Sequence, residues 1–172
     1  FSGALETRFF SDSKPLEDLA IRITDNLEKG YASDPVILNW LKSNPFGYSQ
    51  WFYQRAMTDI TKPLSLKGLI DPEREFQKEK SLLQRIVQLL KRHRDIMFLD
   101  ESLDSDDKPI SIIITTLAAQ AYNRETDFLD ALENVISKMR LHIEERFNFE
   151  KQRFEKWIAN PVNEEENFAD KW

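Results

Sequence analysis

The chain contains no cysteine, and only four glycines and two histidines occur among its 172 residues. The absence of cysteine excludes disulfide bonds, thiolate metal sites and cysteine nucleophiles, and it fits a cytoplasmic location. The two histidines, His93 and His142, leave few ligands for zinc and few partners for a serine nucleophile. We therefore expect no metal site and no nucleophilic dyad built on these residue types, and we expect His142 to be structural.

The chain also lacks an apolar run long enough to span a bilayer, a secretory signal pattern and an excess of basic residues. Its formal net charge is −6, whereas a general nucleic-acid-binding protein carries a basic face. We therefore expect no membrane partner and no strong binding to nucleic acid. The hydrophobic content of 41% is enough to form one buried core.

The best-organised stretch, residues 81–123, predicts two helices joined by an acidic loop. In the first helix, which ends near Phe98, apolar side chains recur on one face at the helical period. The members of this stripe are Leu82, Leu83, Ile86, Val87, Leu89, Leu90, Ile96 and Met97. Arg94 and His93 lie within the stripe and Lys91 lies at its edge, so these cations need partners.

Two capping patterns compete for the start of this helix. Asp71 is followed by Pro72 and by an acidic first turn, which is typical of a helix N-terminus. Ser81 and Gln84 form a capping box ten residues later. The sequence leaves both starts open.

The second helix is predicted from the run PISIIITTLAAQAYN. Pro109 fits its first position, and Ser111 lies in its first turn. The β-branched residues alone are also compatible with a buried strand, but the alanines that follow favour a helix. Because its side chains are apolar almost all round, this helix should form the buried centre of a bundle.

Another helix, from about Gly47 to Met57, should follow a turn at Asn44-Pro45. Its aromatic residues, Tyr48, Trp51 and Phe52, serve either as core anchors or as platforms for stacking bases. We favour the core. A third helix should be capped by Thr126-Asp127, and its inward residues are expected to be Phe128, Leu132, Val135, Ile136, Met139 and Ile143.

Strand signals are few. The stretch 19–25 alternates apolar and polar residues as a strand does, but the sequence shows no second convincing strand to pair with it. The aromatic-rich stretch 147–158 is compatible with a helix or with a short strand. These patterns predict a mainly α fold, a helical bundle with a residual strand near the N-terminus.

The loop between the two central helices, residues 100–108, is strongly acidic. Its Asp104-Ser-Asp106 copies the paired aspartates with which some enzymes hold magnesium, but it lies between helices and follows no Gly-Ser turn. It also lacks the glycine and the distal glutamate of an EF-hand. We interpret the segment as a solvated loop that caps the next helix.

Three ordered stretches carry a resemblance to a known family. They are SNPFGYSQWF at 43–52, the two central helices, and NPVNEEENFADKW at 160–172. Together they resemble the helical half of the bacterial nucleotidyltransferases related to cyclic GMP-AMP synthase and oligoadenylate synthetase, the CD-NTases. The resemblance implies that residues 1–40 are the residual edge of a catalytic core with a linker, and that 41–172 form the C-terminal helical, nucleotide-binding domain of an α+β enzyme.

The same resemblance implies a phosphate site. In the family a lysine on the long helix and a serine at the start of the next helix grip the nucleotide triphosphate, and Lys91 and Ser111 match them. A helix N-terminus also attracts anions on physical grounds, although Lys91 taken alone is better interpreted as a solvated surface lysine. Arg94 either pairs with a buried carboxylate or faces the nucleotide cleft.

The resemblance places the catalytic carboxylates and their Mg²⁺ on the half that is absent from this chain, so we expect no catalytic or metal-binding residues here and no activity of the chain alone. The parent protein should make cyclic oligonucleotide second messengers from nucleoside triphosphates in antiphage defence. Two alternatives stay open. In the first, the chain is a non-enzymatic helical interaction module. In the second, it is a catalytically dead member of the family.

Overall fold

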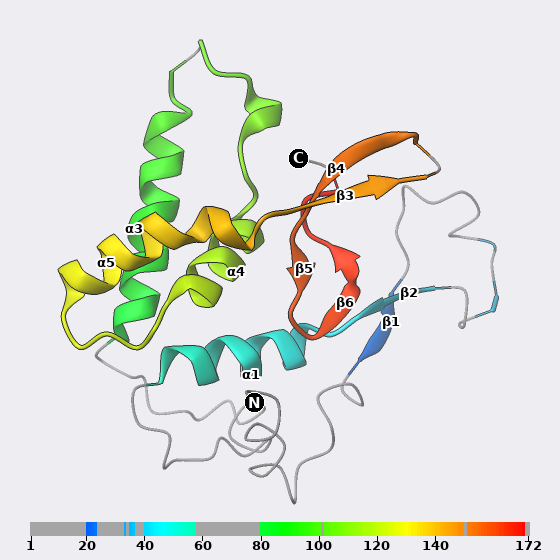
Figure 1. Ribbon diagram of the computed structural model, residues 1–172. Coiled ribbons are helices and arrows are strands. Elements are labelled where there is room, and N and C mark those ends of the chain that lie inside the picture. Colours follow the sequence, from blue (N-terminus) through cyan, green and yellow to red (C-terminus); the bar gives the residue numbers. More distant parts are fainter. Residues whose placement is uncertain are drawn as a thin grey trace, which may run out of the picture.

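The computed structural model describes residues 20–23, 33, 35–36, 40–57, 80–100, 102–149 and 151–170. In this part of the chain the helices are α1 (Pro45–Ala56), α3 (Leu82–Met97), α4 (Ser111–Ala121) and α5 (Phe128–Lys138), with 3₁₀ turns at Ser105–Asp107 and Met139–His142 (Figure 1). The strands are β1 (Ile21–Ile23), β2 (Leu41–Ser43), β3 (Glu144–Asn148), β4 (Arg153–Trp157), β5 (Ala159–Asn160) and β6 (Asn163–Asn167). The predicted mainly α fold with an N-terminal strand is confirmed. None of the described helices is long and apolar enough to cross a membrane.

Helix α4 forms the centre of the fold, as predicted. Eight of its eleven residues are buried, and α1, α3 and α5 pack around it (Figure 1). One core cluster lies between the four helices, with Leu83, Ile86 and Val87 of α3 facing the alanines of α4. A second cluster joins the first half of α4 to Ile158 and Ala169 near the C-terminus. Both clusters depend on α4, because it contributes side chains to each.

The start of α3 is fixed by a capping box. The Ser81 hydroxyl accepts from the Gln84 amide at 3.2 Å, and the Gln84 side chain accepts from the Ser81 amide at 2.9 Å. The start at Ser81 is therefore confirmed for α3, while Asp71 lies outside the described residues. The helix ends at Met97 with Phe98 as its C-cap, which agrees with the predicted end near Phe98.

The start of α1 explains the run Asn-Pro-Phe-Gly. Asn44 is the N-cap, and its side-chain oxygen accepts from the Gly47 amide at 2.8 Å, while Pro45 occupies the first helical position. A Cβ atom at Gly47 would lie 2.5 Å from the side-chain nitrogen of Asn44, so only glycine allows this close cap. The helix thus begins two residues before the predicted Gly47. Trp51 and Phe52 pack against the core, which confirms the core interpretation.

Helix α5 begins at the expected cap, because the Asp127 carboxylate accepts from the amides of Leu129 and Asp130. Its inward face was predicted too broadly. Ile136 is 57% exposed, since the buried face is centred on Ala131 and Val135. Ile143 lies beyond the helix, which gives way to a 3₁₀ turn after Lys138, and packs against the second cluster.

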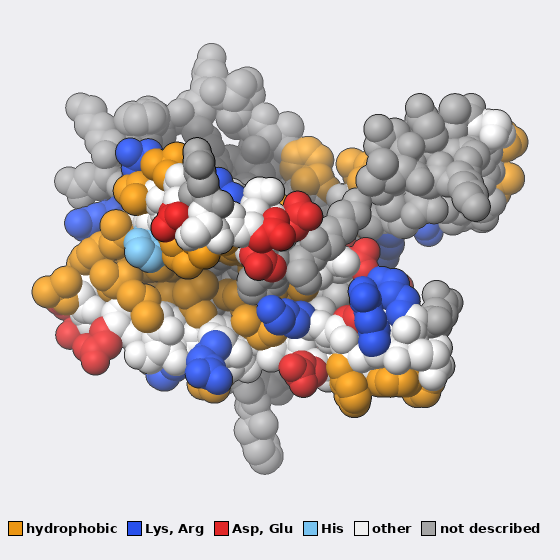
Figure 2. All heavy atoms as spheres, turned by 90° about the horizontal axis from the view of Figure 1, so that it is seen from above, with side chains coloured by type: hydrophobic (Ala, Val, Ile, Leu, Met, Phe, Trp, Pro, Cys, Tyr) orange, Lys and Arg blue, Asp and Glu red, His pale blue; other side chains and the backbone are white. Residues whose placement is uncertain are grey.

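Exposed apolar side chains are concentrated on the helical side of the molecule, where Figure 2 shows them gathered in a band. Those on α3 and α5 are Leu89, Ile96, Met97, Leu129 and Ile136. The core therefore covers only part of the apolar stripe of α3. Its outer members, together with the outer face of α5, are open to solvent among the described residues.

The expectation that the N-terminal strand has no partner was wrong. β1 pairs with β2 in antiparallel register, with Arg22 opposite Lys42, and the Arg22 guanidinium donates to the Trp40 carbonyl at 2.8 Å. β2 escaped notice because it is three residues long, contains Lys42 and Ser43, and leads directly into the α1 cap. The predicted boundary between residues 40 and 41 stays a prediction.

The stretch 147–158 proves to be largely strand. β3 and β4 form a two-stranded antiparallel hairpin in which Phe147 lies opposite Phe154. β5 and β6 form a second short ribbon. Figure 1 shows the β3–β4 hairpin projecting away from the helices.

The three motif stretches of the sequence meet at Tyr48. Its hydroxyl lies 2.9 Å from the Thr116 hydroxyl of α4, and its ring contacts Phe168 edge-on at 5.9 Å between centroids. Tyr48 also lies 5.5 Å from Trp51 on its own helix. The first motif thus binds the other two through one side chain.

The C-terminal end of α4 is closed by two side chains from other elements. Its last carbonyls, which have no partner within the helix, belong to Ala119, Gln120, Ala121 and Tyr122. The Arg55 guanidinium of α1 donates to three of them, with 2.8 Å from its Nε to the Ala119 oxygen. The Asn134 side chain of α5 donates to the Ala121 carbonyl at 2.9 Å. All four backbone carbonyls at this end of the buried helix are therefore hydrogen-bonded.

We predict that Arg55→Ala lowers the free energy of unfolding by about 2–3 kcal/mol, because it leaves several carbonyls without donors. Arg55→Lys should recover only part of the loss, since an ammonium cannot contact three carbonyls in a fork. Urea unfolding followed by circular dichroism measures both. Arg92→Ala, which removes an exposed cation from α3, serves as the control and should change stability by less than about 0.5 kcal/mol. Equal stability of the Arg55→Ala and Arg92→Ala variants would contradict the prediction.

A second prediction concerns alkaline pH. Burial raises the pKa of Tyr48 to about 12, against the opposing effect of its hydrogen bond with Thr116. An unfolded tyrosine ionises near pH 10, so the stability that Tyr48 contributes is complete below about pH 10 and is lost as pH rises towards 12. Tyr48→Phe should therefore show a smaller loss of unfolding free energy over this pH range than the unmodified chain. Identical slopes in pH-dependent urea unfolding would count against a buried, neutral Tyr48.

Candidate functional site

The structure brings two of the three expected site residues into direct contact. The Arg94 guanidinium reaches from α3 to the start of α4, where its Nη1 donates to the Pro109 carbonyl at 2.8 Å and lies 3.3 Å from the Ser111 hydroxyl. Only 13% of the Arg94 side chain is exposed. Arg94 therefore ties the end of the acidic loop and the first turn of α4 to α3.

Arg94 pairs with a carboxylate, but this carboxylate is not buried as predicted. The partner is Asp95, the next residue, at 2.8 Å from Nη2, and 45% of the Asp95 side chain is exposed. Asp95 also contacts the Lys108 ammonium at 3.1 Å. Hydrogen bonds from Lys108 and Arg94 hold the pKa of the Asp95 carboxyl below its usual value. The carboxylate thus stays charged and bridges two cations.

The N-terminus of α4 has no capping side chain. Its N-cap is Ile110, so Pro109 lies before the helix and not at its first position as predicted. Pro109 stays outside the helix because its carbonyl accepts a hydrogen bond from Arg94 of α3. Ser111 is exposed in the first turn, as expected. This end of α4 therefore has an exposed hydroxyl and no side-chain cap on its first amides.

Lys91 lies one turn before Arg94 on α3 and is partly buried. Burial lowers the pKa of its ammonium below the usual value, and the positive charge of Arg94 lowers it further. An anion bound beside these two cations would offset their like charges, and an anion at the uncapped start of α4 would also interact favourably with the helix dipole. The role of Lys91 in binding phosphate stays a prediction.

The acidic loop does not cap α4. The Asp104 carboxylate accepts from the Asp106 amide at 3.0 Å and so opens the 3₁₀ turn Ser105–Asp107. All residues of the loop from Ser102 to Asp107 are exposed. Across the described parts of the chain, no group of three or more His, Cys, Asp or Glu residues is placed to hold a metal ion.

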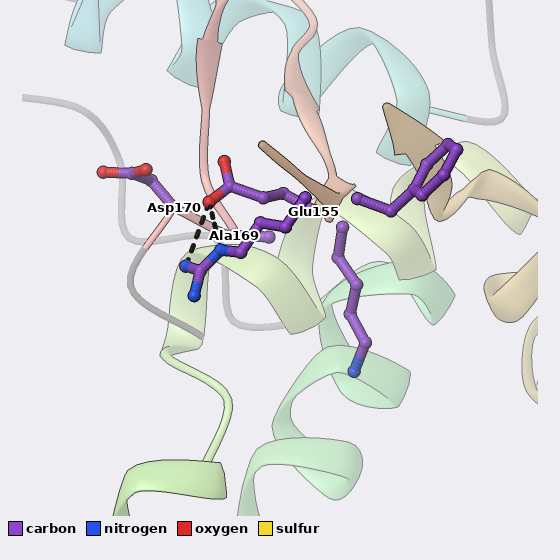
Figure 3. A pocket seen from close by; sticks show the side chains of 6 residues that line it. Glu155, Ala169 and Asp170 are labelled. Atoms are coloured by element: carbon purple, nitrogen blue, oxygen red, sulfur yellow. Dashed lines mark hydrogen bonds and ion pairs between the residues drawn. The ribbon is translucent and has the colours of Figure 1, made fainter. Parts of the chain in front are cut away.

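A hollow of about 330 Å³ lies elsewhere, between β4 and the C-terminal residues Ala169 and Asp170 (Figure 3). Glu155 faces it and pairs with Arg153 at 3.0 Å and with Lys151 at 3.1 Å. Hydrogen bonds from Asn148 and Lys151 lower the pKa of Glu155 to about 2. Glu155 is therefore ionised and paired, which suits a structural carboxylate better than a proton donor. None of the expected site residues lines this hollow.

Two asparagines of the third motif, Asn160 and Asn167, have structural roles. The Asn167 side chain accepts from the Ile158 and Ala169 amides at 2.9 Å each and donates to the Lys156 carbonyl at 3.0 Å. Asn160 donates to Glu166 at 2.7 Å and accepts from the Val162 amide. Sequence reasoning missed these roles, as it missed Asp95 and Lys108. For Asn160, its position between Ala159 and Pro161 was the available signal.

Comparisons with known proteins gave one informative match. No protein-family profile matches the chain, and no solved structure matches it. The chain is 40% identical over 134 residues to a protein of Roseivirga ehrenbergii named c-di-GMP synthase. The match covers 77% of this chain and 34% of that protein, so the chain spans about a third of its relative. This similarity agrees with the three sequence motifs and supports the place of the chain in a cyclic-dinucleotide synthase family of the CD-NTase kind.

Proposed function

We propose that the chain forms the triphosphate-binding part of a nucleotidyltransferase that makes a cyclic dinucleotide. The observation that carries the proposal is the 40% identity to a protein named c-di-GMP synthase. Cyclic di-GMP is accordingly the first product to test, with GTP as substrate. The matched region corresponds in this proposal to the C-terminal helical part of the enzyme. A cytoplasmic location and a role in antiphage defence follow from the family resemblance.

The geometry around α4 supports the binding role. In our proposal the amides of the first turn and the Ser111 hydroxyl donate to phosphate oxygens, while Lys91 supplies a mobile positive charge. Arg94 acts mainly as a positioning residue, because its donors are already directed to Pro109, Ser111 and Asp95. It holds Ser111 beside α3, where Lys91 also lies.

Transfer of a nucleotide needs more than phosphate binding. Metal ions such as Mg²⁺ activate the attacking hydroxyl and stabilise the leaving pyrophosphate. The described residues offer no cluster for such ions. In our proposal the metal-binding carboxylates therefore belong to the nucleotidyltransferase core, and the chain contributes substrate binding and orientation.

We predict that Lys91→Ala weakens triphosphate binding by the complete enzyme about tenfold to a hundredfold. A charged hydrogen bond contributes roughly 1.5–3 kcal/mol, which corresponds to this range of dissociation constants. Calorimetric titration with a non-hydrolysable GTP analogue measures the change. Arg92→Ala is the matched control, because it removes the neighbouring cation from the exposed side of the same helix. Ser111→Ala should cost less, about fivefold, since the backbone amides remain.

Unchanged affinity in Lys91→Ala would assign Lys91 to the solvated surface. Equal weakening by Lys91→Ala and Arg92→Ala would show general electrostatic attraction instead of a defined site. Melting curves of all three variants should match the unmodified enzyme, because Lys91 and Arg92 are not in the core and Ser111 is exposed. A loss of affinity that follows a loss of folding would remove support for the site.

We also predict that the 172-residue chain alone makes no cyclic dinucleotide from nucleoside triphosphates and Mg²⁺. The reason is chemical, because the sequence has no Gly-Ser turn followed by a strand with paired aspartates. Radiolabelled GTP and ATP, separated by thin-layer chromatography after incubation, give the answer. Restoring the core should restore synthesis. Product formed by the purified chain would overturn the assignment of the catalytic carboxylates to the core.

A further inference from the structure

The β3–β4 hairpin exposes an aromatic face that nothing described covers. Residues on alternate positions of each strand share a face, so Glu145 and Phe147 of β3 lie beside Phe154 and Lys156 of β4. Phe149, just past the end of β3, joins this group through an edge-on ring contact with Phe147 at 5.1 Å. Phe147 also contacts Phe154 at 5.2 Å. We call these five residues the phenylalanine face.

The phenylalanine face is open to solvent. Phe147 is 36% exposed, Phe154 is 70% exposed and Phe149 is 79% exposed, and Glu145 and Lys156 are also exposed. The strands pack mainly on one another, and the hairpin projects from the helices (Figure 1). Three adjacent rings in water are unfavourable, and a two-stranded hairpin is marginal by itself. This arrangement is typical of a surface that binds something apolar.

The other face of the hairpin differs in kind. There the Arg146 guanidinium lies over the Trp157 ring at 4.4 Å, and Glu155 is bound by three polar neighbours. The charges on that face are paired within the chain, and Lys151 at the turn contacts Asp170 at 3.4 Å. Of the two faces of the hairpin, only the phenylalanine face is apolar and uncovered by described residues.

The charges on the phenylalanine face favour a second copy of the same chain. Glu145 and Lys156 are directly opposite each other across the two strands, so the face carries one charge of each sign. It therefore attracts neither the phosphates of nucleic acid nor an anionic membrane, which both need a basic surface. A two-fold axis parallel to the strands would place Glu145 of each copy over Lys156 of the other copy. The same axis would stack Phe147 of each copy on Phe154 of the other.

We propose that two copies of this chain associate through their phenylalanine faces. The pairing is isologous, with aromatic stacking at the centre and two ion pairs at the base of the hairpins. The exposed parts of three rings amount to roughly 300–450 Å² per copy. Stable complexes bury about 800 Å² per partner, so the association is weak, with a dissociation constant on the order of 0.1 mM. This inference does not depend on the proposed enzymatic function.

Sedimentation equilibrium of the 172-residue chain from about 10 µM to about 1 mM brackets the expected constant. Self-association should be present in the unmodified chain and lost in Phe149→Glu, which places a charge on the most exposed ring. Leu129→Glu is the matched control, because Leu129 is 71% exposed on α5, away from the hairpin. Far-ultraviolet circular dichroism verifies that each variant is folded.

Exchanging the charges of Glu145 and Lys156 tests whether the partner is a second copy of the chain. Glu145→Lys and Lys156→Glu should each weaken self-association at least about tenfold, because like charges then meet across the axis. An equimolar mixture of the two single variants should restore association as a mixed dimer, and the double exchange should restore it within one chain.

A monomeric unmodified chain at every concentration would overturn the proposal. Association that survives Phe149→Glu but is lost in Leu129→Glu would also overturn it, since the apolar band of α3 and α5 would then be the interface. Failure of the two single variants to associate when mixed would exclude the two-fold arrangement. Each result distinguishes the hairpin interface from another contact between copies.

Discussion

Helix α4 can be buried almost all round only because side chains of other helices satisfy the carbonyls at its C-terminal end. Burial removes water from these carbonyls, and an unpaired one would cost free energy comparable to a lost hydrogen bond. At the C-terminal end, Arg55 and Asn134 supply donors to four carbonyls. At the N-terminal end, Arg94 binds the Pro109 carbonyl and holds the chain as it enters the helix. The positions of α1, α3 and α5 around α4 are thus coupled to hydrogen bonds as well as to apolar contacts.

The two ends of α4 are not equivalent. The C-terminal carbonyls are completed by protein, whereas the N-terminal amides have no side-chain cap and Ser111 is exposed. Arg94 and Lys108 lie near the open end and share the Asp95 carboxylate, and Lys91 lies one turn before Arg94 on α3. The acidic loop with Asp104, Asp106 and Asp107 leads into the same end. A cation held close to another cation, as Lys91 is to Arg94, is stabilised by an anion, and the open helix end provides the directed donors that an anion needs.

Sequence reasoning succeeded where one local signal sufficed. The capping box at Ser81, the aspartate cap at Asp127 and the all-round apolar character of α4 each fix a feature without tertiary information. Sequence reasoning failed where a contact between residues distant in sequence determines the structure. Ile136 is exposed because the neighbouring helices meet α5 at its small residue Ala131, and β2 forms because β1 lies beside it. At the site, the predicted residues Arg94 and Ser111 do meet, but the ion pairs through Asp95 and Lys108 depend on how the acidic loop returns to α3.

The motifs that support the family assignment and the residues that would bind substrate have different physical roles. Tyr48, Thr116 and Phe168 join the three motifs in a packed contact, and Asn167 holds the C-terminal segment through backbone hydrogen bonds. Selection for folding alone would preserve these residues in an active enzyme and in an inactive relative. Lys91 and exposed Ser111 contribute little to the core, so packing gives no reason to keep them. The affinity of Lys91 and Ser111 variants for a triphosphate therefore tests function in a way that similarity across the motifs does not.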